Sequence, residues 1–229
     1  MSNNIEILFD NIASNYDRLN HILSFGIDRI WRRKTANIIA NTSPCKILDV
    51  AAGTADMSIE LRRKTKAAIY AIDISEKMIE IGRQKIEKLK LDNITLEKGC
   101  SDNIPFEDNI FDAVTIAFGV RNFQHREKSL SESFRVLKPQ GIVAILEFSY
   151  PTNKTIKWLY DIYFNRIMPF VGTKISNDTK AYRYLRDSVH HFPKGEEFLI
   201  ELRKAGYSDT IEKRLCFGIV SLYMGKKNS

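Results

Sequence analysis

The sequence predicts an α/β fold, with a mostly parallel sheet, helices on both faces and one antiparallel strand. Between Lys46 and Ser149, continuous apolar runs alternate with amphipathic helical stretches, which is typical of a parallel sheet covered on both sides. Near the C-terminus, the strand-like runs YSDTIEKRL and GIVSLYMGKK are separated by only two residues, so we expect them to pair antiparallel. The 229 residues, 44% of them hydrophobic, suffice for a single domain with its own core.

The N-terminal part of the chain predicts two helices. Apolar residues recur at helical spacing in IEILFDNIASNYDRLNHIL and again in DRIWRRKTANIIA, and Gly26 between them indicates a connection. Pro44 then ends the second helix before the first strand.

The central part of the chain alternates between strands and helices. In the stretch SEKMIEIGRQKIEKLK, Ser75 is the expected N-cap, and Ile74 is placed to pack on Ile79 across it. The stretch REKSLSESFRVLK is expected to form a helix that ends at Pro139. The strands are expected at residues 46–51, 67–73, 94–99, 111–119 and 141–149.

After Pro151 the alternation is interrupted. The segment TNKTIKWLYDIYFNRIMPFVG predicts an aromatic helix of about four turns. We therefore divide the single domain into N-terminal helices at 1–43, a core at 44–150, a helical insertion at 151–206 and antiparallel strands at 207–229.

Composition narrows the class of protein. A net charge of +7 favours an anionic partner without choosing among lipid, nucleic acid and phosphorylated small molecules. The three cysteines are scattered, with no disulfide framework and no metal-ligand spacing, so we expect no metal site. No signal peptide and no membrane-spanning apolar run are evident, which predicts a cytoplasmic protein.

The stretch KILDVAAGTADMSIEL carries the main functional signal. A strand ends near Asp49, small residues surround Gly53, and a helix begins directly afterwards. Small residues let a ligand approach the backbone, and a helix start offers free N–H groups at the carboxyl end of a parallel strand. Only one of the three glycines of a dinucleotide loop is present, and the Lys-Ser/Thr pair of a P-loop is missing. Pyrophosphate binding is therefore disfavoured.

The same stretch resembles the first motif of the class I S-adenosylmethionine-dependent methyltransferases, in which an acidic residue and a small-residue turn precede Gly-x-Gly. Asp73 follows Gly53 by 20 residues, at the end of the second strand. A carboxylate at that place can accept hydrogen bonds from both ribose hydroxyls. The resemblance implies a Rossmann-like sheet with S-adenosyl-L-methionine as cofactor.

Longer segments resemble a narrower family. YDRLNHILSFGIDRIW (16–31) and RVLKPQGIVAILEFSYP (135–151) are similar to the two signatures of the quinone C-methyltransferases, which act on demethylmenaquinone and on the 2-methoxy-polyprenyl-benzoquinol precursor of ubiquinone. IAFGVRN (116–122) and AYRYLRDSVHHFP (181–193) match further blocks, so the resemblance covers nearly the whole chain. It implies C-methylation of a prenylated quinol, with the N-terminal helices acting as a lid.

Site residues follow from the resemblance, position by position. It implies catalytic roles for Arg121 and for the lid residue Tyr16. Substrate contacts are implied for Phe118, Arg121, Asn122 and Tyr182. Cofactor contacts are implied for Asp49, Gly53, Thr54, Asp73, Ile74, Cys100, Ser101 and Ala117.

Three positions in the site depart from the family pattern. Ala55 replaces the second glycine of the loop and is tolerated if its φ is negative. Cys100 and Ala117 stand where the family has asparagine and serine, and each loses a hydrogen-bonding group worth about 0.5–1.5 kcal/mol. Two readings therefore stay open beside the quinol enzyme: a methyltransferase for a soluble phenol or amine, and a non-catalytic relative that no longer binds the cofactor.

The proposed chemistry gives Arg121 a defined task. Ring methylation needs a quinol hydroxyl to lose its proton, and Arg121 would stabilise the resulting oxyanion directly or through a water. The alternative for Arg121 is that it is a surface arginine paired with an acidic residue of a helix. The alternative for Tyr16 is that it packs between two helices. The histidines His21, His125, His190 and His191 are expected to be solvated or to cap helices.

The implied partner is a prenylated quinol, most simply demethylmenaquinol in menaquinone biosynthesis, and no nucleic acid is expected. Peripheral contact with an anionic membrane is a further hypothesis, since an apolar stripe on the aromatic helix alternates with Lys154, Lys157 and Arg166. The alternative is that the stripe packs in the core; its members are Ile156, Leu159 or Tyr160, Tyr163 and Ile167.

Overall fold

A seven-stranded sheet forms the centre of the protein. The computed structural model describes residues 6, 7, 9, 10, 13, 24, 26–163 and 179–228. Within them the strand order is β3-β2-β1-β4-β5-β7-β6, and every neighbouring pair is parallel except the two that involve β7. The expected sheet with one antiparallel strand is thus confirmed. The strands are β1 (Lys46–Val50), β2 (Ala68–Asp73), β3 (Ile94–Lys98), β4 (Phe111–Ala117), β5 (Leu137–Phe148), β6 (Ser208–Leu215) and β7 (Val220–Lys226).

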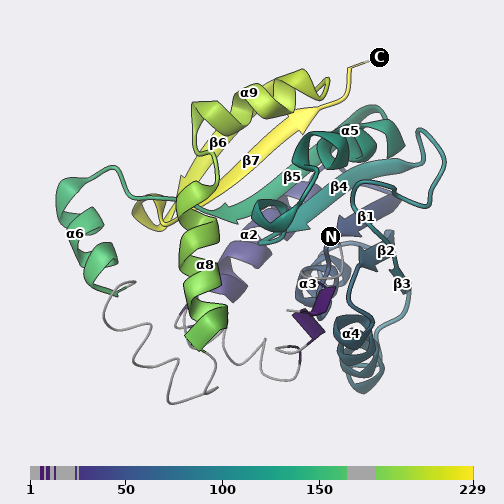
Figure 1. Cartoon of the computed structure of the whole chain (residues 1–229). Helices are drawn as coiled ribbons and strands as arrows, with labels where there is room; N and C mark the ends of the chain where they lie inside the picture. The colour runs from purple at the N-terminus through teal and green to yellow at the C-terminus, as the bar shows by residue number, and fades with distance from the viewer. Residues whose placement is uncertain are drawn as a thin grey trace.

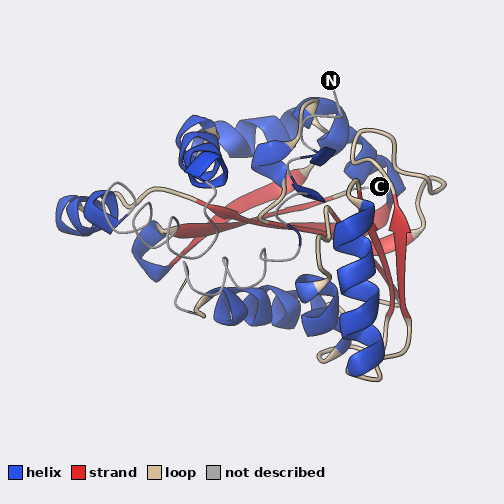
Figure 2. Ribbon diagram, turned by 60° about the horizontal axis from the view of Figure 1, so that its bottom comes forward, coloured by secondary structure: helices blue, strands red, loops and turns tan. Residues whose placement is uncertain are grey.

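Helices cover both faces of the sheet (Figure 2). Helices α2, α3 and α4 pack on one face, while α5 and α9 pack on the other through a second apolar cluster. Figure 1 shows α6 standing apart from the sheet, with α8 between it and the core. The helices are α2 (Asp28–Ala40), α3 (Asp56–Arg62), α4 (Glu76–Lys88), η1 (Val120–Asn122), α5 (Arg126–Val136), α6 (Lys154–Ile162), α8 (Thr179–His191), α9 (Glu196–Lys204) and η3 (Cys216–Gly218).

The winding of the chain reverses between β1 and β4. These strands lie side by side, yet from β1 the chain proceeds outward to β2 and from β4 it proceeds outward to β5 in the opposite direction. Ligands of such folds bind at this point, beyond the carboxyl ends of the strands. The loop that contains Gly53 follows β1 and therefore lies where a ligand is expected.

Ser75 caps α4 as predicted, since its Oγ accepts a hydrogen bond of 3.2 Å from the N–H of Met78. The end of α5 differs from the prediction, because the helix stops at Val136 and β5 begins at Leu137, before Pro139. A register shift between β4 and β5 absorbs the proline, and Gln140, with φ +65°, donates its N–H to Lys227 O at 2.7 Å. A bulge of this kind admits proline into a strand.

Ala55 adopts a left-handed conformation with φ +66°, so the negative φ on which its tolerance was premised is wrong. Ala51 also has a positive φ, at +55°. The left-handed conformation costs a residue with a Cβ about 1–2 kcal/mol. At Ala55 burial of the methyl group against Ala71, Ile79 and Leu96 offsets about 0.8 kcal/mol of that cost.

The insertion is described only in part. Its aromatic helix corresponds to α6, whose described bounds are shorter than the four turns expected, and residues 164–178 lie outside the described residues. The same holds for most of the first predicted helix, whereas the second is confirmed as α2. No helix among the residues described is both long enough and apolar enough to cross a membrane.

Candidate functional site

A cavity of about 400 Å³ lies at the carboxyl ends of the central strands. That volume falls in the range of about 300–1,000 Å³ that is usual for small-molecule sites. Several predicted site residues line it together: Gly53, Asp73, Ile74, Cys100, Ser101, Phe118 and Asn122. The other lining residues are Phe9, Ala51, Met78, Gly99, Asp102, Gly119, Phe123, Gln124, His125 and Ser129.

Asp73 ends β2 and presents a carboxylate that the backbone holds in place. Its Oδ2 accepts a hydrogen bond of 2.7 Å from the N–H of Gly53, and its Oδ1 accepts one of 2.9 Å from the N–H of Ser75. The residue is 8% exposed. Burial raises the pKa of Asp73, and the backbone N–H groups of Ser75 and Gly53 counter that rise. Each carboxylate oxygen can accept a second hydrogen bond, so Asp73 can accept two ligand hydroxyls.

The floor of the cavity depends on a close approach between two turns. A Cβ placed on Gly119, just after β4, would lie 2.7 Å from the Cβ of Ala51, just after β1. Real Cβ atoms do not come that close, so a side chain at position 119 would push the two turns apart. The small residues that the sequence places after β1 thus serve packing as well as ligand approach.

Asp49 lies in β1 and is fully buried, without lining the cavity. Its Oδ2 accepts a hydrogen bond of 2.6 Å from the hydroxyl of Ser58, while Oδ1 has no hydrogen-bond partner among the described residues. Burial raises the pKa of Asp49 to about 7, and the Ser58 hydroxyl and the charge of Arg32 act against the rise. A cation bound near Asp49 would favour its ionised form.

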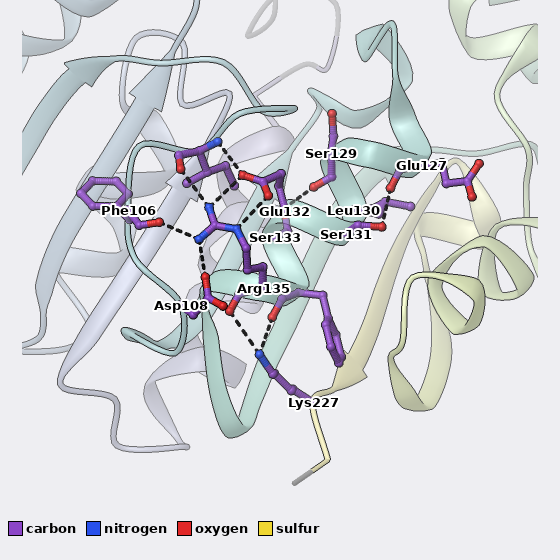
Figure 3. A network of polar contacts seen from close by, with 12 residues as sticks. Phe106, Asp108, Glu127, Ser129, Leu130, Ser131, Glu132, Ser133, Arg135 and Lys227 are labelled. Carbon is purple, nitrogen blue, oxygen red and sulfur yellow. Dashed lines mark hydrogen bonds and ion pairs between the residues drawn. The ribbon is translucent and has the colours of Figure 1, made fainter.

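A polar network attaches the loop after β3 to α5. The hydroxyls of Ser101 and Ser129 lie 2.9 Å apart across the cavity wall. Farther along the same loop, Arg135 donates to the carbonyl oxygens of Ile104 at 3.0 Å and Phe106 at 2.8 Å, and it pairs with Glu132 (Figure 3). The arginine of RVLKP therefore holds the loop that carries Cys100 and Ser101.

Arg121 lies in η1 behind the cavity and does not line it. Its Nη1 donates to Glu147 Oε1 at 2.7 Å and to the carbonyl oxygen of Phe118 at 2.5 Å, and its guanidinium lies 5.4 Å from the ring centroid of Phe148. The Arg121 side chain is 6% exposed and that of Glu147 is fully buried. The alternative of a surface arginine paired with a helix acid is therefore wrong, because the pair is buried and the acid lies on β5.

Asn122 contacts a tyrosine that the sequence analysis did not select. The hydroxyl of Tyr184, on α8, donates a hydrogen bond of 3.0 Å to Asn122 Oδ1. The side chain of Tyr182 and the whole of Tyr16 lie outside the described residues.

Besides Asp49, two more predicted cofactor residues do not line the cavity. Thr54 is buried, and its hydroxyl accepts a hydrogen bond of 3.2 Å from Lys85 Nζ. Ala117 ends β4 within the same apolar cluster as Leu146, so its lack of a hydroxyl does not alter the cavity lining. Cys100 does line the cavity, and its replacement of asparagine changes the lining there.

Sequence reasoning missed residues that face the cavity from helix starts and turns. Met78 and Ser129 lie in the first turns of α4 and α5, and Gln124 and His125 precede α5. His125 is exposed, as expected of a solvated histidine, but it lies at the cavity. The signal was available, since residues that follow parallel strands gather at one edge of the sheet.

The chain matches the ubiE/COQ5 methyltransferase family over residues 1–227. It is 44% identical to the ubiquinone/menaquinone biosynthesis C-methyltransferase UbiE of Geobacter sulfurreducens, over 97% of this chain and 88% of that protein. It is 41% identical to the demethylmenaquinone methyltransferase of Bacteroides fragilis strain ATCC 25285, over 99% and 93% of the two chains.

Solved structures share the fold. One is an S-adenosyl-L-methionine-dependent methyltransferase, by its description, from Methanococcus maripaludis, with a TM-score of 0.70, 23% identity and coverage of 96% of this chain and 94% of that one. Another is phosphoethanolamine N-methyltransferase 2 of Haemonchus contortus in complex with S-adenosyl-L-methionine, with a TM-score of 0.64, 13% identity and coverage of 96% and 60%.

Proposed function

This chain belongs to the ubiE/COQ5 methyltransferase family, and on that premise we propose that it transfers a methyl group from S-adenosyl-L-methionine to a ring carbon of a prenylated quinol. The observation that supports the proposal best is the backbone-held carboxylate of Asp73 in a cavity at the reversal of the sheet. Relatives named demethylmenaquinone methyltransferase favour demethylmenaquinol as the substrate.

The lining fits an adenosyl group. Asp73 would accept the ribose hydroxyls, while Gly53 and Ala51 leave the backbone open to close approach. Cys100 and Ser101 would flank the base, because they follow β3 on the side of the cavity beyond Asp73. Asp49 does not line the cavity, but its carboxylate, when ionised, would attract a positively charged ligand bound at the turn that follows β1.

When bound, S-adenosyl-L-methionine supplies an electrophilic methyl group on a sulfonium centre. The protein has to aim a ring carbon at that methyl group and to stabilise negative charge on the neighbouring ring oxygen. Asn122 lines the cavity and its amide can donate to that oxygen. We assign Arg121 an indirect role through a water, because its Nη1 is bonded to Glu147 and to the Phe118 carbonyl.

The segments that flank the core would form the substrate side. We propose that residues 1–43 close over the donor with Tyr16 as the lid residue, and that the insertion 151–206, with Tyr182, contacts the quinol. Phe118 would face the ring from the end of β4, where it lines the cavity.

Mass spectrometry of a reaction with S-adenosyl-L-methionine tests the function. We expect demethylmenaquinol to gain one methyl group on carbon, and more slowly the demethylated benzoquinol precursor of ubiquinone. Short soluble phenols serve as the comparison. Methylation of those phenols at the quinol rate would favour the soluble-substrate enzyme, and no detectable binding of S-adenosyl-L-methionine by calorimetry would favour the non-catalytic relative.

We also propose that α6 contacts an anionic membrane surface from which a prenylated substrate would enter. The predicted apolar stripe turns inward at Tyr160, which is buried, whereas Trp158 is 62% exposed beside the exposed Lys154 and Lys157. Phe217, 79% exposed, belongs to the same region: η3 directly follows β6, and Arg214 near the end of β6 donates from its Nη1 to Oγ1 of Thr152, just before α6, at 3.3 Å. Exposed tryptophan next to lysine is typical of interfacial binding.

Flotation with vesicles that contain anionic lipid tests this contact. Replacing Lys154 and Lys157 by glutamine should weaken binding by roughly 2 kcal/mol, or about thirtyfold, since each lysine near an anionic surface contributes about 1 kcal/mol. The matched control replaces Lys77 and Lys88, which are exposed on α4. Equal loss in the control, or no salt-sensitive binding of the wild type, would refute the contact.

A further inference from the structure

We propose that Tyr184 is a positioning residue that fixes the side-chain amide of Asn122 with its two N–H groups toward the quinol. The inference rests on the proposed function and deepens it, because it names how the site recognises a ring oxygen. It also gives a function to α8 and to Tyr184, which was not predicted from the sequence.

The geometry joins two elements that are distant in sequence. Asn122 ends η1 directly after β4 and lines the cavity, whereas Tyr184 lies on α8, which packs against η1. Between them, the Tyr184 hydroxyl donates to Asn122 Oδ1 at 3.0 Å, with both side chains half-buried.

An asparagine amide has one accepting oxygen and two donating N–H groups, and a neighbouring group decides which end faces a ligand. Tyr184 occupies the oxygen. Burial raises the pKa of Tyr184, the charge of Arg121 acts against the rise, and the charge of Glu147 adds to it. The hydroxyl therefore stays protonated and able to donate at neutral pH. The N–H groups are left for the cavity.

That orientation suits the chemistry of an electron-rich ring. When the quinol hydroxyl has given its proton to solvent, the negative charge left on the ring oxygen is held best by a preorganised donor. An acceptor turned toward the same oxygen would repel it. Without the Tyr184 hydroxyl, the Asn122 amide can rotate, and the fraction of molecules with N–H groups facing the oxygen falls.

A double-mutant cycle on kcat tests the coupling. We expect Tyr184→Phe to lower kcat about tenfold and Asn122→Ala about a hundredfold, in line with the loss of one oxyanion donor. The double variant should equal Asn122→Ala alone, because Tyr184 acts only through that amide. The KM for S-adenosyl-L-methionine should stay within a few-fold throughout. Independent, multiplied losses would overturn the role of Tyr184.

Tyr70→Phe is the matched control, since Tyr70 packs against Phe106 and Phe111 and does not line the cavity. We expect its kcat to match the wild type. A second readout needs no turnover: in ¹⁵N-labelled protein the Asn122 side-chain NH₂ signal, identified by its loss in Asn122→Ala, should shift in Tyr184→Phe and stay in place in Tyr70→Phe. An unshifted signal in Tyr184→Phe would disprove the hydrogen bond.

The two proposals fail in different ways. If the wild type methylates neither quinol, the proposed function falls and this inference falls with it. If the wild type methylates demethylmenaquinol but the cycle is additive, only the assignment of Tyr184 falls.

Discussion

Replacing Arg121 by methionine should lower the free energy of unfolding by about 3–5 kcal/mol, because it leaves the carboxylate of Glu147 buried without its counter-ion. Glu147 is fully buried on β5, and Arg121 is the cation that pairs with it at 2.7 Å. The substitution also removes the donor to the carbonyl oxygen of Phe118, at the point where β4 turns into η1. Urea denaturation followed by circular dichroism measures the loss.

The paired variant Arg121→Met with Glu147→Gln separates stability from catalysis. It replaces both charges, so most of the lost stability should return. If Arg121 also serves the reaction, turnover of the paired variant should remain more than tenfold below the wild type, with the affinity for S-adenosyl-L-methionine changed by only a few-fold. A stable paired variant with normal turnover would show that Arg121 only holds η1 in place.

Arg121 also illustrates how far the sequence alone predicts the site. Its place after an apolar strand, within the block GVRN, was enough to select it. Its partner was not evident, because Glu147 lies 26 residues farther on and meets it only through the register in which β4 pairs with β5. Long-range contacts of this kind depend on strand pairing, which periodicity does not encode.

The prediction of Tyr182 rather than Tyr184 as a site residue also shows that the sequence does not reveal contacts between distant segments. Tyr182 and Tyr184 are two residues apart on α8, and successive residues of an α-helix are rotated by about 100° around its axis, so two such positions are not equivalent. The sequence places both on one helix, but only the packing of α8 against η1 decides that Tyr184 meets Asn122. Local signals fared better: the Ser75 cap and the position of Asp73 at the end of β2 both follow from adjacent residues.

The prediction of a negative φ at Ala55 was wrong for a different physical reason. An alanine in place of glycine indicates only a small increase in side-chain size, and the sequence carries no sign of the backbone angle φ at that position. The structure has φ +66° there, with the methyl group buried against the contact between α4 and β3. Burial of the methyl group offsets part of the conformational cost, so the loop keeps its shape without the second glycine.

Replacing Asp73 by asparagine should weaken binding of S-adenosyl-L-methionine by roughly 2–4 kcal/mol, or about 30- to 1,000-fold. Hydrogen bonds to a charged group contribute about 1.5–3 kcal/mol each, and the carboxylate would accept two from the ribose. An amide keeps one accepting oxygen, so its NH₂ group must also face either the N–H of Gly53 or that of Ser75. Either the turn after β1 or the start of α4 then loses its hydrogen bond to residue 73. Isothermal titration calorimetry measures the affinity.

Asp112 provides a matched control at the amino ends of the central strands, opposite to the cavity. It too is an aspartate that accepts two backbone N–H bonds, from Cys45 at 2.9 Å and Lys46 at 2.8 Å, and it pairs with Lys138. Lys46, Asp112 and Lys138 lie at the beginnings of β1, β4 and β5, and Cys45 directly precedes β1, so the group lies a full strand length from the cavity. Asp112→Asn should therefore lower stability modestly and leave the affinity for S-adenosyl-L-methionine unchanged. If both variants bound as tightly as the wild type, Asp73 would be a structural tie between β2 and the Gly53 turn, and the adenosyl group would have to be held elsewhere in the cavity.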